Sequence, residues 1–155
     1  MYQRIKRVEL EPVLAILPQL QFVSVNQSGG KYPCDVVLKT DFPLVLWRFI
    51  AGLELGGEQA RVILRRLGPR QNIPPHVDDW MPKGMDWRRF QVPLITHPNI
   101  LMRWPDDEME VHLAPGFLWE VCITHRHEVI NNADIDRIHL QIDQVNATIQ
   151  PSKEI

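Results

Sequence analysis

Short strand-like segments, divided by turn residues, fill this chain from residue 36 onward. The 13 prolines are scattered along the sequence and interrupt long helices. The predicted strands cover residues 36–38, 44–50, 60–67, 89–96, 100–104, 110–113, 117–123, 128–130 and 137–145. Pairs of turn-forming residues separate them at positions 56–57, 68–69, 74–75, 115–116 and 131–132. Many short strands at this spacing favour an antiparallel sandwich or barrel.

A short helix is predicted in front of these strands. Residues 11–20 are the best helical candidate, with Pro12 near the first turn and Pro18 where the helix should end. We therefore predict a mainly β protein with a double-stranded β-helix, a cupin-like jelly roll, and an N-terminal helical flank. A chain of 155 residues is long enough for a hydrophobic core, so residues 1–155 are predicted to form a single domain.

Composition and charge argue against several classes of protein. The net charge of −2 argues against a nucleic-acid-binding surface. No apolar run approaches the roughly 18–20 residues of a membrane span, and the basic N-terminus lacks the apolar stretch and cleavage site of a signal peptide. Cys34 and Cys122 do not make a disulfide framework and are expected as reduced thiols. We expect a cytoplasmic protein that binds neither nucleic acid nor a membrane.

Three potential metal ligands lie within the predicted β region. Successive strand residues point to opposite faces, so His76 and Asp78 point the same way if residues 75–78 form a short strand. Together with His127 they offer two imidazoles and one carboxylate, a set that forms one face of a ferrous site with open positions. Zinc sites with three protein ligands usually leave one open position rather than three. The pattern therefore predicts iron(II) bound by these three residues.

Arg137 follows His127 by ten residues, which suggests how a co-substrate could bind. If the flanking segments form a hairpin about Asn132, positions 127 and 137 lie opposite each other with their side chains on a shared face. A 2-oxoglutarate that chelates the iron through its keto acid end could then extend its far carboxylate to Arg137. Guanidinium forms a bidentate pair with a carboxylate, which lysine does not reproduce.

The same alternation places two more histidines on this face. His125 is a rival to His127 as the third metal ligand. His139 is a candidate for contact with the co-substrate or with a metal ligand. The alternative for both is a histidine that serves only the protein core.

These residues resemble the aspartyl/asparaginyl β-hydroxylase family of 2-oxoglutarate oxygenases. The resemblance extends from about residue 60 to residue 143, which includes the predicted metal and co-substrate core at about 60–145. Its motifs are residues 67–69, 73–78, 89–94, 117–120, 127–131 and 136–140. The resemblance implies that His76, Asp78 and His127 bind iron and that Arg137 binds the far carboxylate of 2-oxoglutarate.

One position departs from the family pattern. Members often carry a histidine two residues after the arginine of the 89–94 motif, where this chain has Gln91. Arg89 and Gln91 are then the candidates to support the metal-chelating end of 2-oxoglutarate. The carboxylate ligand is missing in some members but present here as Asp78, so the resemblance implies a complete triad.

Two further features are candidates for contact with substrate. The segment 80–87 follows the metal motif directly, and Trp80 and Trp87 could close over a pocket or simply pack on the edge of the sandwich. Basic pairs occur at positions 65–66 and 88–89. Alternation lets only one arginine of each pair face inward, where it could bind an anionic substrate group.

The pattern as a whole predicts an oxidoreductase, an iron(II)- and 2-oxoglutarate-dependent dioxygenase that acts as a hydroxylase and releases succinate and CO2. The family resemblance implies an amino acid side chain as target, free or in a peptide. One alternative is a cupin-like metal enzyme without 2-oxoglutarate, which would have no use for an inward Arg137. The other is a non-catalytic jelly-roll binding module, against which the complete set of three metal ligands argues.

Overall fold

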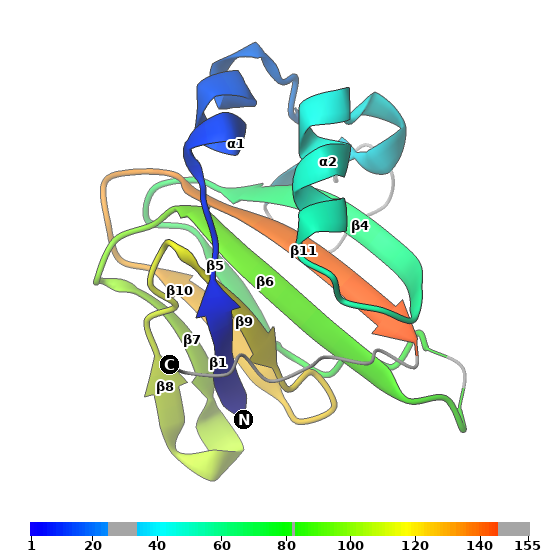
Figure 1. The fold of residues 1–155 in the computed structure, drawn as a ribbon. Helices are drawn as coiled ribbons and strands as arrows, with labels where there is room; N and C mark the ends of the chain where they lie inside the picture. The colour runs from blue at the N-terminus through cyan, green and yellow to red at the C-terminus, as the bar shows by residue number, and fades with distance from the viewer. Residues whose placement is uncertain (25–33, 82, 146–155) are drawn as a thin grey trace.

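The chain folds into two antiparallel sheets, which the computed structural model describes for residues 1–24, 34–81 and 83–145 (Figure 1). The larger sheet contains, in spatial order, β1 (Tyr2–Arg7), β9 (Phe117–Val121), β6 (Trp87–Ile95), β11 (Arg137–Val145), β4 (Glu58–Leu67), β3 (Cys34–Leu38) and β2 (Val23–Ser24). The smaller sheet contains β5 (Asn72–His76), β10 (His127–Asn131), β7 (Ile100–Trp104) and β8 (Met109–Val111). The prediction of a mainly β jelly roll is confirmed.

Two α-helices pack on the same side of the larger sheet, α1 (Glu11–Ile16) and α2 (Leu44–Gly52) (Figure 1). Their buried side chains, such as Val13 and Leu46, share one apolar cluster with Leu140 of β11. Three 3-10 turns complete the described elements: η1 (Leu17–Gln19), η3 (Lys39–Asp41) and η4 (Pro105–Asp107). None of the helices in the described residues is long and apolar enough to cross a membrane.

The predicted N-terminal helix is present, but it changes form before its end. α1 stops at Ile16, the 3-10 turn η1 continues to Gln19, and the backbone is extended at Leu20. Pro18 lies inside that turn, where its missing amide proton costs no α-helical hydrogen bond. The helical flank was therefore predicted correctly.

The strand predicted for residues 44–50 is wrong, because this segment is the helix α2. Its buried residues are Leu46 and Ile50, and Leu53 follows with 2% exposure. That spacing of four and three residues is the period of a helix with one apolar face. Pro43 occupies the N-cap, a position where its missing amide donor does no harm.

The predicted hairpin between the segments of His127 and Arg137 is also wrong. β10 belongs to the smaller sheet and β11 to the larger one, so the chain crosses between the sheets at residues 132–136. The buried Asn131 shapes this crossing: its amide donates to the carbonyls of Gly68 and Ile135, and its side-chain oxygen accepts from the amide of Ala133. The turn is thus held by side-chain hydrogen bonds, and β10 and β11 do not pair with each other through their backbones.

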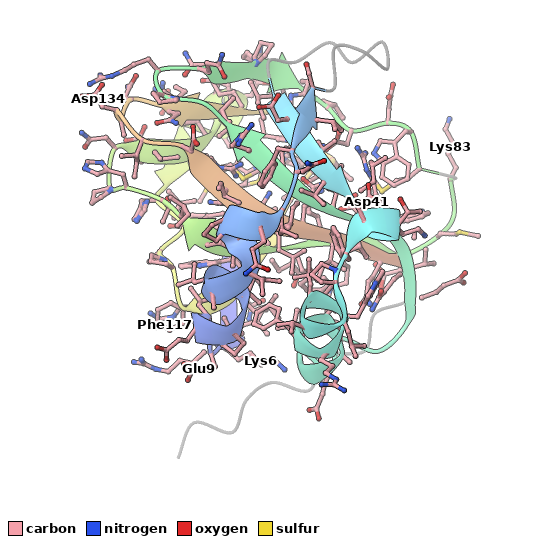
Figure 2. All side chains as sticks on the ribbon, turned by 90° about the horizontal axis from the view of Figure 1, so that it is seen from above. Lys6, Glu9, Asp41, Lys83, Phe117 and Asp134 are labelled. Atoms are coloured by element: carbon pink, nitrogen blue, oxygen red, sulfur yellow. The ribbon has the colours of Figure 1, made fainter. Side chains whose placement is uncertain are left out.

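The crossing passes over the outer surface, where Asp134 lies at the edge of the molecule (Figure 2). Its carboxylate accepts a hydrogen bond of 2.8 Å from Nε of Arg70. As a result of the crossing, the side chains of β10 and β11 approach each other across the space between the two sheets.

Candidate metal centre

The two predicted histidine ligands stand side by side on neighbouring strands. His76 ends β5 and pairs in register with His127, the first residue of β10. The centroids of their rings are 4.4 Å apart. β5 is an edge strand of the smaller sheet and contains Pro74 and Pro75, as edge strands tolerate.

Asp78 lies beyond the end of β5, so the prediction of one short strand over residues 75–78 is wrong in its boundary. The backbone amide of Asp78 donates instead to the carbonyl of Ile123, at 3.2 Å. This bond holds the chain close to the connection between β9 and β10. The carboxylate therefore still reaches the two imidazoles, although strand alternation is not the reason.

The ligand atoms of His76, Asp78 and His127 all lie within 4.8 Å of one another. Nε2 of His76 is 3.8 Å from Oδ1 of Asp78, and Nε2 of His127 is 3.4 Å from Oδ2. This is the only such group of three or more among the described residues. Two nitrogen donors and one oxygen donor form the set that iron(II) takes in non-haem oxygenases.

Backbone carbonyls fix both imidazoles in the form that binds a metal. Nδ1 of His76 lies 2.8 Å from the carbonyl of Pro74, and Nδ1 of His127 lies 2.9 Å from that of His125. A carbonyl only accepts, so each Nδ1 must carry the proton, which leaves the lone pair of Nε2 directed at Asp78. The residues therefore fit iron(II).

The protonation states of two of these residues suit the same purpose. Burial lowers the pKa of His76 below its ordinary value, which favours the neutral ring. Burial would raise the pKa of Asp78, but its contact with the His127 ring and the charge of Arg89 outweigh it and hold that pKa well below the usual range. Neutral imidazole and ionised carboxylate are the forms that coordinate metals.

His125, the predicted rival, lies outside this centre. Its side chain is 51% exposed, and its Nδ1 is 3.1 Å from a carboxylate oxygen of Asp107. The next residue, Arg126, is paired with Asp106 in the same way. These two contacts attach the loop before β10 to the turn η4, and this loop presents His127.

Arg89, predicted as a co-substrate contact, joins two carboxylates in the structure. Its Nη1 donates to Oδ2 of Asp78 at 2.5 Å, while Nε and Nη2 form a bidentate pair with Asp143 at 2.6 and 2.9 Å. Arg89 is 5% exposed and Asp143 is fully buried. All three guanidinium nitrogens thus have a carboxylate partner, and the arrangement orients Asp78.

Arg137, Gln91 and His139 form a second buried group. The side-chain oxygen of Gln91 accepts from Nη2 of Arg137 at 3.1 Å and lies 2.8 Å from Nδ1 of His139, which must be the donor. Burial and the charge of Arg65 lower the pKa of Arg137 to about 9, and burial holds the pKa of His139 well below its ordinary value. Gln91 thus holds Arg137 in place through its amide oxygen.

A cavity of about 360 Å³ connects the metal centre with Arg137. It is lined by Val36, Leu38, Arg61, Ile63, Arg65, Ile73, His76, Asp78, Trp80, Arg89, Gln91, Met102, His127, Val129, Arg137 and Gln141. Arg61 and Gln141 were not among the site residues predicted from the sequence. Alternation could have found both, because Arg61 shares a strand face with Arg65, and Gln141 shares one with Arg137.

The two tryptophans after the metal motif differ in their relation to this cavity. Trp80 lines it and is 44% exposed, whereas Trp87 lies outside its lining. The two rings meet edge to face with centroids 5.5 Å apart, and the guanidinium of Arg61 lies 5.5 Å from the ring centroid of Trp80. Trp87 therefore packs against Trp80 from outside the cavity lining. Residue 82 of this segment lies outside the described residues.

A family model described as aspartyl/asparaginyl beta-hydroxylase matches residues 45–147. A search of curated proteins by sequence found no significant match. Among solved structures, a prolyl-4-hydroxylase from Pseudomonas putida is similar over 94% of this chain and 90% of its own, with 13% identity and a TM-score of 0.66.

Two further structures share the fold. The 2-oxoglutarate-dependent epimerase SnoN from nogalamycin biosynthesis is 14% identical over 99% of this chain and 81% of its own, with a TM-score of 0.66. A 2OG-Fe(II) oxygenase family oxidoreductase from Burkholderia pseudomallei is 16% identical over 88% of this chain and 77% of its own, with a TM-score of 0.59. At such identities these likenesses establish the jelly-roll fold alone.

Proposed function

Since this chain belongs to the aspartyl/asparaginyl β-hydroxylase family, we propose that it is an iron(II)- and 2-oxoglutarate-dependent dioxygenase that hydroxylates an amino acid side chain. The observation that carries the proposal is the placement of two kinds of group in one cavity. His76, Asp78 and His127 converge on a metal position, and a buried Arg137 lines the same space.

His76, Asp78 and His127 hold the iron. Bound iron and 2-oxoglutarate supply the oxidising chemistry, which consumes dioxygen and yields succinate, CO2 and a hydroxylated product. The two histidines bind through Nε2, because each Nδ1 is occupied by a backbone carbonyl. Arg89 keeps the carboxylate of Asp78 ionised and turned toward the two rings.

Arg137 binds the far carboxylate of 2-oxoglutarate. Only its Nη2 is used by Gln91, so the remaining donors are available for a bidentate pair. Neutral His139 donates to the same oxygen of Gln91 and so fixes its direction. Here Gln91 and His139 position the arginine. Trp80 covers part of the cavity and helps to exclude water from it.

The two other functions predict different properties for this cavity. A cupin-like enzyme without 2-oxoglutarate leaves the positive charge of Arg137 without a carboxylate at 3% exposure, and a binding module has no use for three converging metal ligands. Burial of an unpaired charge is strongly unfavourable. That charge therefore favours the use of a dicarboxylic co-substrate.

The test is an anaerobic titration of the iron(II) protein with 2-oxoglutarate. Chelation should produce a weak visible charge-transfer band, and exposure to air should then yield succinate, measured by NMR. His127→Ala should abolish iron binding, whereas His125→Ala should retain it, because His125 faces Asp107 at the surface. A folded, iron-loaded protein with neither band nor succinate would refute the proposed function.

A further inference from the structure

The cavity is lined by four arginines and one carboxylate. The arginines are Arg61, Arg65, Arg89 and Arg137, and the carboxylate is that of Asp78. The neighbouring Arg66 and Arg88 point elsewhere and pair with Asp35 and Glu120. The inward arginine of each basic pair is therefore identified, and Arg61 adds a further positive charge.

Of the four inward arginines, only Arg89 pairs with a carboxylate that is not a proposed metal ligand. Arg89 forms its bidentate pair with the fully buried Asp143. Among the described residues, no ion pair involves Arg61, Arg65 or Arg137. Three guanidinium groups thus face one cavity without a carboxylate of their own.

Arg65 lies close to Arg137 and lines the same cavity. The charge of Arg65 is close enough to lower the pKa of Arg137. Nη1 of Arg65 contacts Sγ of Cys34 at 3.3 Å, and its Nε is buried without a partner. Sulfur is a weak acceptor, so Arg65 keeps most of its capacity to donate to the far carboxylate of 2-oxoglutarate.

Arg61 lies nearer the metal. It shares the inward face of β4 with Arg65, but the two residues are four positions apart, which is roughly 13 Å between their Cα atoms along the strand. It stands opposite Asp143 in register with β11, and Asp143 pairs with Arg89, which contacts Asp78. Burial and the charge of Arg65 lower the pKa of Arg61, whereas the charges of Asp143 and Asp78 raise it. Its guanidinium lies beside Trp80, whose side chain is part of the cavity lining.

The charges of the loaded centre do not cancel. Iron(II) with one carboxylate ligand leaves one positive charge, and 2-oxoglutarate brings two negative charges. Arg65 and Arg137 return two positive charges, so the centre is already positive before Arg61 is counted. A partly desolvated cavity with an excess of positive charge favours an anionic occupant.

On the basis of the proposed function, we infer that the substrate carries a carboxylate and that Arg61 binds it beside the metal, with Trp80 covering the complex. Two chemical sources provide such a group. One is the α-carboxylate of a free amino acid, and the other is the side chain of an acidic residue in a peptide. In both cases a bidentate pair with Arg61 places the target carbon within reach of the iron.

The test compares carboxylates with their uncharged amides. One arm uses the free L-amino acids and their α-carboxamides. The other uses the N-acetyl N-methylamides of aspartate and glutamate, and those of asparagine and glutamine. Binding is measured from the change in the charge-transfer band of the anaerobic iron(II) and 2-oxoglutarate complex, and by saturation-transfer NMR on zinc-loaded protein.

At least one carboxylate should bind ten-fold or more tightly than its amide, and the arm in which this occurs identifies the source. Arg61→Gln should abolish the preference while iron and 2-oxoglutarate still bind. Arg61→Lys should retain part of it. The matched control is Arg66→Gln on the same strand, which should change nothing because Arg66 faces Asp35. Equal binding of carboxylates and amides, or a preference that survives in Arg61→Gln, would overturn the inference.

The two proposals fail in different ways. If the charge-transfer band forms but no carboxylate preference exists, the oxygenase proposal stands and the role of Arg61 is wrong. If no band forms but zinc-loaded protein binds carboxylates in a manner that depends on Arg61, the anion site exists without the proposed reaction.

Discussion

The two faces of β11 are equally buried and chemically opposite. All nine residues of the strand are buried. Ile138, Leu140 and Ile142 point toward the helices and join the main apolar core. On the other face, Arg137 and Gln141 line the cavity, His139 holds Gln91, and Asp143 holds Arg89. One strand therefore supplies both the core and the floor of the candidate site.

The apolar face of β11 stabilises the fold, and the polar face provides groups for ligand binding. A fully buried leucine contributes roughly 1.5–3 kcal/mol through removal of apolar surface from water. A buried polar side chain is unfavourable unless its hydrogen bonds are satisfied, and a buried charge is more so. We therefore expect substitutions on the apolar face to change stability, and most substitutions on the polar face to change ligand binding.

The largest expected effect is at Asp143, which lies on the polar face but should affect stability. Asp143→Ala leaves the charge of Arg89 buried without its bidentate partner, which should lower the free energy of unfolding by about 3–5 kcal/mol. Urea denaturation measures this change. The double variant Arg89→Met with Asp143→Leu should recover most of the loss. A decrease below about 1 kcal/mol would mean that the pair contributes little to the fold.

The second effect is at Leu140 on the apolar face, which should affect stability but not iron binding. Leu140→Ala removes a fully buried side chain from the core and should cost about 2–5 kcal/mol of stability. The folded variant should bind one iron with unchanged affinity. Leu44→Ala is the matched control, because Leu44 is 62% exposed and should change stability by less than about 0.5 kcal/mol. Loss of iron affinity in folded Leu140→Ala would show that the faces are coupled.

The third effect lies on the polar face. Arg137→Lys converts a bidentate contact into a single-point contact and should weaken 2-oxoglutarate binding by about 1–3 kcal/mol, or about ten- to hundred-fold. Calorimetry of the anaerobic zinc-loaded protein gives this value. Iron binding should remain, and Arg66→Lys serves as control. An unchanged affinity would remove Arg137 from the co-substrate site.

The smallest effect concerns His139. Burial holds its pKa well below the ordinary value of 6.5, so the unfolded chain takes up a proton that the folded protein does not. The stability linked to this difference is complete above about pH 6.5 and is lost as the pH falls, by at most about 1.4 kcal/mol per unit. His139→Gln should therefore reduce the acid sensitivity measured by urea denaturation. An identical pH dependence in both proteins would contradict this assignment.

Alternation was sufficient to predict the strands of the larger sheet that line the site, but not β5, where Pro74 and Pro75 were predicted as a turn. β11 matches its predicted limits, and β4 and β6 differ from theirs by one or two residues. These strands are central in the larger sheet and combine an apolar face with a polar one, so their period of two is clear. β1 was missed, because Tyr2–Arg7 contains mostly charged and polar residues and gains its place by pairing with β9.

Contacts between segments that are far apart in the sequence could not be predicted. The partner of Arg89 is Asp143, which is 54 residues away, and no local pattern connects them. The crossing after Asn131 depends on side-chain bonds to Gly68, which lies on a different part of the chain. α2 resembles a strand in composition, because Val45, Trp47 and Phe49 are β-branched or aromatic, but its buried residues Leu46 and Ile50 have the spacing of a helix.

The edge position of β5 has a consequence for the behaviour of the protein at high concentration. An edge strand exposes backbone groups on which the strand of another molecule can assemble, which is a common start of aggregation. Pro74 and Pro75 have no amide proton and cannot donate to such a strand. The chain can therefore keep His76 at the border of a sheet, open to an incoming ion, without making that border a template for self-association.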